Sequence, residues 1–528
     1  MPRRIEVYDV TLRDGAQGPR VKFSAEDQVH IIQALDAFGV SYIEGGQPGS
    51  NPKAADLFAR ARELTLKHAK MAAFGSTRHP RHAVEDDPNI QALLAADTEV
   101  VTIFAKSWPL HVQEVLRIGL DDNLDLIEDS VAYLKAQGRR VFLDAEHFFD
   151  GYAHDPAYAL ATLERAWTAG AEVLVLCETN GGALPWQVTD AVRTVHERLP
   201  DAPLGIHAHN DSGCGVPNSL AAVREGAVQV QGTINGYGER TGNANLCTII
   251  PNLQLKMGFD VVSPAQLQGL TRLSHLVAEV ANLAPPDHQP FVGRDAFTHK
   301  GGMHADAVTK LKTSYEHIDP DAVGNRTHIT VSEVSGRSSL LQKAAEFGIH
   351  LDRDRPETRQ ILERVKVLES EGYEFEGADA SLELIMRKAT GEYRTFFTLR
   401  GFRVSVDRSD ADGPSVSEAT VKIELPNGER MHTAAEGEGP VDALNCALRK
   451  ALEITYPELR NVHLEDYKVR ILDAQAATRA TTRVLIESTD GETSWDTVGV
   501  SENIIAASYD ALVDSIEYML LQTRGHIE

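Results

Sequence analysis

Eight short apolar runs, each followed by a stretch with helical character, occupy the first half of the chain. They begin with IEVYDVTL at residues 5–12 and end with AVQVQGTINGYGE at residues 227–239. Between the first two runs, Ser24 is an N-cap candidate and Gly39 a helix stop. Eight βα units in about 250 residues predict a TIM (β/α)8 barrel. A doubly wound sheet is the alternative, but no GxGxxG motif follows the first run.

The pattern changes twice further along the chain. We predict a catalytic barrel at residues 1–259, helical linker subdomains at residues 260–392 and an α+β domain at residues 393–528. In the last part, two similar stretches each read as a hairpin followed by a helix, with turn signals at Asn427-Gly428 and Asp490-Gly491. Duplicated ββα units at the end of an enzyme indicate a regulatory or dimerisation domain.

Composition limits the partners of such a chain. It has 52 Lys and Arg residues against 77 Asp and Glu, a formal net charge of −25, which argues against binding to nucleic acid or to an anionic membrane. No apolar run is long enough to cross a bilayer and no signal-peptide core is evident, so we expect a cytoplasmic protein. The four cysteines form no CxxC pair, so neither a disulfide framework nor a zinc–thiolate site is predicted.

Polar residues cluster where the barrel strands are predicted to end, which is the face that carries the active site in TIM barrels. His207 and His209 are two residues apart in the seventh run and therefore point to the same side of a strand. Alone, such a pair also fits two half-buried histidines. However, Asp14 follows the first run and Asn243 the eighth, and these strands are neighbours in a closed barrel. The four residues together predict a divalent metal site, whose open positions a 2-oxo acid could occupy.

Other residues at the strand ends have candidate roles in chemistry at a carbonyl group. Arg13 could stabilise the oxyanion formed when a nucleophile adds, or an enolate beside it. Glu146 could position or deprotonate the nucleophile, although a helix cap or an ion pair is an alternative reading. Thr179 and Asn180 could bind a substrate carboxylate or simply cap the following helix. Gln17, after the first run, is a further candidate for substrate binding.

Longer motifs surround these residues, and they include TLRDGAQ, YIEGG, DAEHFFDGY, LCETNGG and HAHNDSGCGVPNSL, with EGPVDALNCALRKAL and WDTVGVSENIIAAS near the C-terminus. In these motifs the sequence resembles the family of 2-isopropylmalate, homocitrate and citramalate synthases over essentially the whole chain. Within that family, YIEGGQPGSNPK, FAKSWPLHV and DAEHFFDGY are most similar to the citramalate synthases.

The resemblance implies a role for each candidate residue. Manganese or magnesium, with zinc as the alternative, would be held by the family's four ligands, which fall on Asp14, His207, His209 and Asn243. The family's essential arginine, active-site glutamate and substrate-carboxylate ligand fall on Arg13, Glu146 and Thr179. Its linker histidine, which reaches the barrel of the neighbouring subunit as an acid or base, aligns with His304 in GGMHADAV.

The resemblance also implies the reaction, a Claisen-type condensation of acetyl-CoA with a 2-oxo acid followed by thioester hydrolysis, in a homodimer under feedback control. Pyruvate as acceptor would give (R)-citramalate on a route to isoleucine, with isoleucine as the expected inhibitor. 2-Oxoisovalerate would instead give 2-isopropylmalate on the route to leucine. The two acceptors differ by a methylene or two, which a pocket discriminates by only about 1–3 kcal/mol.

Two other classes of protein agree less well with the residues. A hydroxymethylglutaryl-CoA lyase would carry Gly-Cys-Pro after the eighth strand, where this chain has GYGERTGNANLC. An amino-acid sensor built on an inactive barrel would have no need of the intact residues Arg13, Asp14, His207 and His209.

Overall fold

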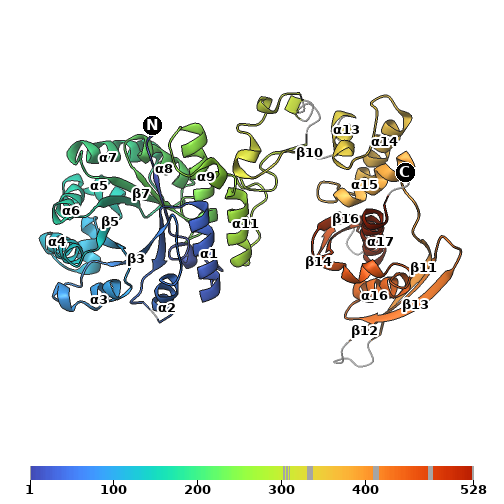
Figure 1. The fold of residues 1–528 in the computed structure, drawn as a ribbon, viewed down its shortest axis with the longest axis horizontal. Helices are drawn as coiled ribbons and strands as arrows, with labels where there is room; N and C mark the ends of the chain where they lie inside the picture. Colours follow the sequence, from blue (N-terminus) through green and yellow to red (C-terminus); the bar gives the residue numbers. More distant parts are fainter. Residues whose placement is uncertain are drawn as a thin grey trace. The chain divides into compact units, whose positions relative to one another are not determined.

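A computed structural model describes residues 2–50, 52–300, 304, 307–308, 310–329, 337–407, 415–473 and 480–525 (Figure 1). Two compact units make up the chain: Met1–Phe297 with His317–Arg326, and Thr298–Glu316 with Thr327–Glu528. The divisions expected after residues 259 and 392 therefore fall inside these units, and each unit is described by itself. Among the described residues, no helix is both long and apolar enough to cross a membrane.

The first unit is built on a closed barrel of eight parallel strands, in which each strand pairs with the next and β8 pairs with β1. The predicted TIM barrel is thus confirmed. Its strands are β1 (Glu6–Asp9), β2 (Tyr42–Gly46), β3 (Lys70–Ser76), β4 (Val100–Lys106), β5 (Arg140–Glu146), β6 (Val173–Glu178), β7 (Leu204–Ala208) and β8 (Gln229–Gly232).

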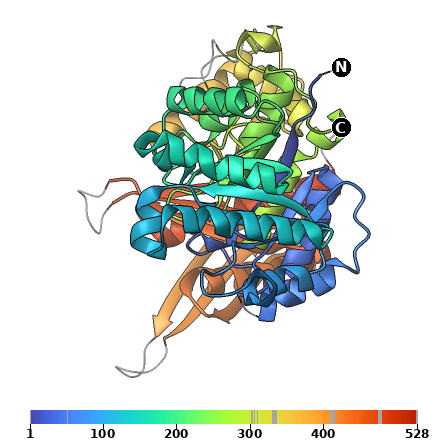
Figure 2. The same ribbon diagram turned by 90° about the vertical axis from the view of Figure 1, so that its left-hand side faces the viewer.

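Helices form the outer layer of the barrel, which Figure 2 shows with this unit turned toward the viewer. In the first of them, the Ser24 hydroxyl accepts a hydrogen bond from the Asp27 amide while the Asp27 carboxylate accepts one from the Ser24 amide, and Gly39 ends the helix with φ 95°. Both predicted helix ends are confirmed. The helices of this unit are α1 (Ala25–Phe38), α2 (Pro52–Ala61), α3 (Pro88–Ala95), α4 (Leu120–Ala136), α5 (Phe148–His154), α6 (Pro156–Ala169), α7 (Pro185–Arg198), α8 (Gly215–Arg224), α9 (Leu246–Pro251), α10 (Pro264–Leu267) and α11 (Leu270–Val280).

The barrel buries two apolar layers, because neighbouring residues of a strand point to opposite sides. One layer lies between the strands and the helices. The other fills the barrel interior, where the rings of Tyr8, Tyr42 and Phe142 pack with centroids between 5.2 and 6.3 Å apart. The Tyr8 hydroxyl donates a hydrogen bond of 2.8 Å to Glu44. This bond joins the apolar interior to the polar residues at the carboxyl ends of the strands.

The second unit combines helices with two antiparallel sheets. The sheets are β11–β12–β13 and β14–β15–β16, and one helix follows each sheet, which confirms the predicted α+β end and the helix-rich segment before it. The elements are β9 (Thr298–His299), β10 (His328–Ile329), α13 (Arg337–Glu346), α14 (Pro356–Ser370), α15 (Asp379–Thr390), β11 (Thr398–Asp407), β12 (Val416–Glu424), β13 (Arg430–Gly437), α16 (Pro440–Leu452), β14 (His463–Ile471), β15 (Thr482–Thr489), β16 (Ser494–Ser501) and α17 (Ile504–Arg524).

Each repeated unit of this domain has one strand more than the sequence predicted. The hairpins with turns at Gly428 (φ 83°) and Gly491 (φ 90°) are present, but β11 and β14 extend them to three strands. No residue of either additional strand is fully buried, so neither shows the apolar alternation of a strand with one covered face. Gly499 lies within β16. A Cβ atom at this residue would approach the Ala507 carbonyl oxygen of α17 to 2.0 Å, so the glycine permits close packing of the helix on the sheet.

Candidate active site

A cavity of about 300 Å³ opens at the carboxyl ends of the barrel strands, where the sequence predicted the active site. The predicted residues that line it are Arg13, Asp14, Gln17, Glu146, Thr179, His207 and His209. The lining also includes Gln47, Phe74, Phe104, Asp144, Cys177, Glu239 and Arg240. Residues from all eight strand ends and the loops that follow them thus meet in one small space.

His304 is the predicted site residue that belongs to the second unit, not to the barrel. It is exposed, and its ring stacks on Tyr315 with centroids 4.2 Å apart. Residues 301–303, 305, 306 and 309 of the same predicted loop lie outside the described residues. The proton-transfer role of His304 therefore stays a prediction.

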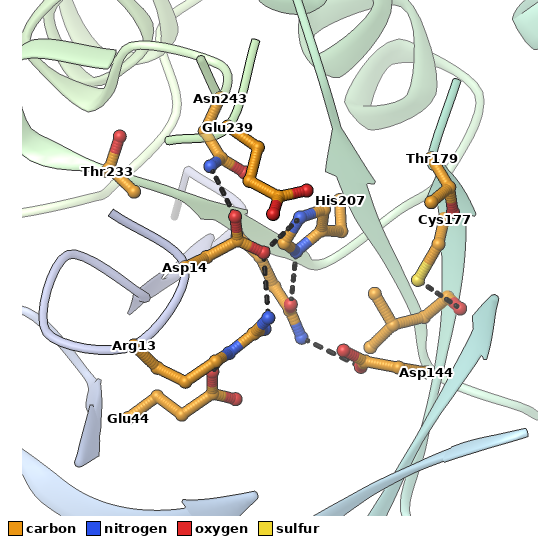
Figure 3. A network of polar contacts seen from close by, with 12 residues as sticks. Arg13, Asp14, Glu44, Asp144, Cys177, Thr179, His207, Thr233, Glu239 and Asn243 are labelled. Atoms are coloured by element: carbon orange, nitrogen blue, oxygen red, sulfur yellow. Dashed lines mark hydrogen bonds and ion pairs between the residues drawn. The ribbon is translucent and has the colours of Figure 1, made fainter. Parts of the chain in front are cut away.

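Three buried residues of the cavity form a candidate metal site. One ligand atom from each of Asp14, His207 and His209 lies within 4.8 Å of the other two. Asn243 completes the predicted set: its Nδ2 donates to Asp14 Oδ1 at 2.9 Å and to the Tyr237 carbonyl at 3.0 Å (Figure 3). Within the described part of the chain, the buried atoms Asn243 Oδ1 and His209 Nδ1 have no hydrogen-bond partner. Such buried acceptors are costly unless a ligand or ion satisfies them.

His207 supplies a second reason to expect a cation. Its Nδ1 lies 2.9 Å from Gln231 Oε1, an amide oxygen that can only accept, so Nδ1 carries the hydrogen. In the neutral ring, Nε2 then presents its lone pair to Asp14 Oδ2, which is 3.6 Å away. Two acceptors facing each other at this distance repel unless a cation lies between them. Mixed imidazole and oxygen donors suit a divalent ion, so the residues present fit such a metal.

The surroundings of His209 and Asp14 also shift the pKa values of these two residues. Burial, together with the neighbouring His207, lowers the pKa of His209 to about 4, so its imidazole is neutral and can act as a ligand at neutral pH. Burial alone would raise the pKa of Asp14, but Arg13 and the two histidines hold it well below its usual range. Both effects keep the ligand atoms free of protons, as metal binding requires.

Arg13 is a partly buried cation held between two carboxylates. Its Nε donates to Glu44 at 2.5 Å and its Nη1 to Asp14 at 2.7 Å, and the guanidinium lies over the Phe74 ring at 3.9 Å from the centroid. Burial alone would lower the pKa of Arg13, but these carboxylates outweigh it and raise the pKa above its usual value. Nη2 has no partner among the described residues, so Arg13 has N–H groups to offer to a ligand in the cavity.

Glu146 ends β5, and Thr179 directly follows the neighbouring strand β6. Glu146 pairs with Lys106, which ends β4. The Thr179 hydroxyl accepts a 2.9 Å hydrogen bond from the amide of His147, a residue in the left-handed conformation (φ 57°). A side chain in this conformation costs about 1–3 kcal/mol, and such strain is often found at functional sites. Among the described residues no group accepts from the Thr179 hydroxyl, so its hydrogen can be donated to a substrate.

Several residues of the site received no role from the sequence. Glu44 and Asp144 lie at strand ends, but their partners, Arg13 for Glu44 and Gln231 for Asp144, were not evident from the sequence. Burial, reinforced by Glu44, raises the pKa of Asp144 to about 8. Gln229 and Gln231 did leave a signal, because two amides in the short run QVQG are unusual in a strand whose interior face is expected to be apolar.

Comparison with known proteins agrees with this architecture. Residues 4–277 match the HMGL-like family, residues 291–372 a domain described as homocitrate synthase post-HMGL domain-like, and residues 376–520 the LeuA allosteric (dimerisation) domain. The C-terminal part is thus of the allosteric or dimerising type predicted from the sequence.

The chain also has relatives that match it over its full length. It is 52% identical to an (R)-citramalate synthase of Aquifex aeolicus over 99% of both chains. It is 53% identical to an (R)-citramalate synthase of Geobacter sulfurreducens over 98% of this chain and 97% of that one. A 2-isopropylmalate synthase of Oceanobacillus iheyensis is 29% identical over 99% and 98%, respectively. The chain therefore belongs to the HMGL-like family, in the group of 2-isopropylmalate, homocitrate and citramalate synthases, and the resemblance seen in the sequence is confirmed.

Proposed function

We propose that this protein is an (R)-citramalate synthase, which condenses acetyl-CoA with pyruvate and releases (R)-citramalate and CoA. The observation that carries this proposal is the full-length identity of 52% and 53% to (R)-citramalate synthases, against 29% to a 2-isopropylmalate synthase. The cavity supports a small acceptor, since its volume is only about 300 Å³. The stacked rings of Phe74 and Phe104, with centroids 5.4 Å apart, further restrict it.

The residues around the cavity have complementary roles toward a 2-oxo acid. A divalent ion, Mn²⁺ or Mg²⁺ with Zn²⁺ as the alternative, would be held by Asp14, His207, His209 and Asn243 Oδ1 and would act as a Lewis acid on the acceptor's keto oxygen. The free hydroxyl hydrogen of Thr179 would donate to the acceptor's carboxylate, with Gln17 as a further donor at the same mouth. These contacts would orient the keto carbon toward the incoming nucleophile.

The condensation requires that a base remove a proton from the methyl group of acetyl-CoA. Glu146 is the barrel's candidate for this step, because its carboxylate lines the cavity and Lys106 fixes its position. As the methyl carbon bonds to the keto carbon, the keto oxygen becomes negative, and Arg13 Nη2 would donate to it. A proton then neutralises this alkoxide, and His304 is the candidate acid for this step. Water finally cleaves the thioester, and CoA leaves as the thiol.

The choice of acceptor is the decisive test of the function. Purified full-length protein with Mn²⁺ or Mg²⁺ and acetyl-CoA is assayed for release of the CoA thiol with pyruvate, 2-oxobutyrate, 2-oxoisovalerate and 2-oxoglutarate. We expect the highest kcat/KM with pyruvate, and loss of turnover in chelator that returns when metal is added. A preference for 2-oxoisovalerate would make the protein a 2-isopropylmalate synthase instead.

We also propose that the protein is a homodimer inhibited by isoleucine, because its C-terminal part matches the LeuA allosteric (dimerisation) domain. A cut before residue 393 would separate α15 from α17 and expose the buried residues Ala380 and Leu384, so the test uses the full chain. Isoleucine should inhibit more strongly than leucine or valine, and pyruvate should change its affinity reciprocally in calorimetry. Sedimentation measures the oligomeric state. If none of the three amino acids binds or inhibits, the regulatory proposal fails.

A further inference from the structure

A chain of buried hydrogen bonds crosses the barrel interior from β5 to β7 and ends at the candidate metal site (Figure 3). Gln231 Nε2 on β8 donates to Asp144 Oδ1 on β5 at 3.1 Å, and Gln231 Oε1 lies 2.9 Å from His207 Nδ1 on β7. The three residues are between 0 and 4% exposed, so bulk water does not compete for these groups. At its far end, the chain places His207 Nε2 at 3.6 Å from Asp14.

The order of donors and acceptors along this chain determines which nitrogen of His207 carries a hydrogen. Gln231 Nε2 donates to Asp144 Oδ1, and this hydrogen bond holds the NH₂ end of the amide against the carboxyl group. The amide oxygen must then face His207, which fixes the hydrogen on Nδ1 and leaves the Nε2 lone pair for a metal. With the amide reversed, its NH₂ group would face Nδ1, and the hydrogen would move to Nε2, where it would block the ligand position.

We propose that Asp144 and Gln231 are positioning residues that set the tautomer of His207 for metal binding. The inference rests on the metal site of the proposed function and adds the two residues that prepare one of its ligands. Neither residue is one of the metal ligands proposed above, and the effect of each reaches the metal through His207. Partners of this kind typically change metal affinity by about 10–100-fold when they are removed.

The same strand supplies a matched control. Gln229 precedes Gln231 by two residues on β8, so it points to the same side of the strand, and it is equally buried. Neither atom of the Gln229 amide has a hydrogen-bond partner in the described part of the chain. Replacing either glutamine by methionine keeps the length of the side chain and removes one buried amide, but only Gln231→Met interrupts the path to His207.

The experiment measures Mn²⁺ affinity, with no substrate present. Full-length protein is stripped of metal with a chelator that is then removed, and free Mn²⁺ is followed by electron paramagnetic resonance during titration. Gln231→Met should weaken binding by about 10–100-fold, whereas Gln229→Met should stay within about threefold of the parent. The double variant Gln231→Glu with Asp144→Asn exchanges the amide and the carboxyl group between the two positions, so the pair still consists of one of each. It keeps an acceptor against His207 Nδ1 and should bind Mn²⁺ at least as tightly as the parent.

Other results obtained with folded variants overturn the inference. Equal affinity of folded Gln231→Met and parent would show that the amide does not position His207. Equal losses in Gln229→Met and Gln231→Met, or no recovery in the double variant, would assign the effect to packing. If Gln231→Met does not fold, Asp144→Val removes the acceptor that orients the amide and takes its place in the comparison. If the parent itself binds no Mn²⁺, the metal site of the proposed function fails, and this inference fails with it.

Discussion

Replacement of Arg13 by alanine should affect stability and catalysis through two separable causes. Glu44 is fully buried, and its ion pair with Arg13 at 2.5 Å offsets the cost of removing its charge from water. Removing one partner of a buried pair leaves an unpaired charge, which costs about 3–5 kcal/mol. The lost contact between the guanidinium and the Phe74 ring adds about 0.5–2 kcal/mol. We therefore expect Arg13→Ala to lower the free energy of unfolding by about 3.5–7 kcal/mol. It should also lower kcat by about 100-fold or more, since a donor to the oxyanion is lost.

The second variant, Arg13→Ala with Glu44→Gln, separates these causes. The neutral amide removes the unpaired charge but keeps an oxygen for the Tyr8 hydroxyl, which donates to Glu44 at 2.8 Å. Stability should recover by about 2 kcal/mol or more, whereas kcat should not. Urea unfolding in chelator, with hydrogen exchange of β1 and β2 to report on the barrel, measures stability, and release of CoA measures kcat. An Arg13→Ala protein as stable as the parent would refute the charge argument. Recovery of kcat in the double variant would refute the oxyanion role. If Arg13→Ala raised KM and left kcat unchanged, Arg13 would be reassigned to substrate binding.

Two further predictions concern Asp9 and Thr179. Burial raises the pKa of Asp9 from its usual value of 3.8 to about 7 in the folded chain, so folding favours the protonated form, and stability is lost as the pH rises from about 4 through 7. The difference between 3.8 and about 7 in pKa corresponds to about 4 kcal/mol. Asp9→Asn should therefore reduce the change in unfolding free energy between about pH 4 and 7 by up to this amount. An unchanged pH profile in urea unfolding would contradict this. Thr179→Val should raise KM for pyruvate about tenfold, the cost of one lost hydrogen bond to a charged group, with little change in KM for acetyl-CoA. Steady-state kinetics in which each substrate is varied in turn measures both KM values. Equal effects on the two would count against binding of the pyruvate carboxylate by Thr179.

The barrel could be predicted because its determinants are local. The capping pair Ser24 and Asp27, the stop at Gly39 and the alternating runs each depend on residues close in sequence. Given a closed barrel, strand order alone brought Asp14 to His207 and His209. The additional strands β11 and β14 were missed for a local reason as well: they are largely exposed, and a strand that buries little carries little apolar pattern.

The partners of the buried polar residues could not be predicted, because they lie far apart in sequence. Asp144 and Gln231 are separated by 87 positions and Arg13 and Glu44 by 31, and each contact depends on the stagger of the strands as well as on their order. A shift of one residue in the pairing of a single strand would turn these side chains to the other face. Periodicity identifies which residues face the interior, but it does not identify which of them meet.

The charges around the barrel mouth provide an electrostatic argument for a metal ion at this site, in addition to the chemical argument from the ligand atoms. A 2-oxo acid is an anion, and the chain that must attract it has a net charge of −25. Around the cavity, Arg13 is shared between Glu44 and Asp14, Lys106 is paired with Glu146, and Arg240 is paired with Asp211. Because each of these cations already contacts a carboxylate, they supply little net positive field. A divalent ion at Asp14, His207 and His209 would reverse the local sign, so the buried metal site would govern acceptor binding as well as activation.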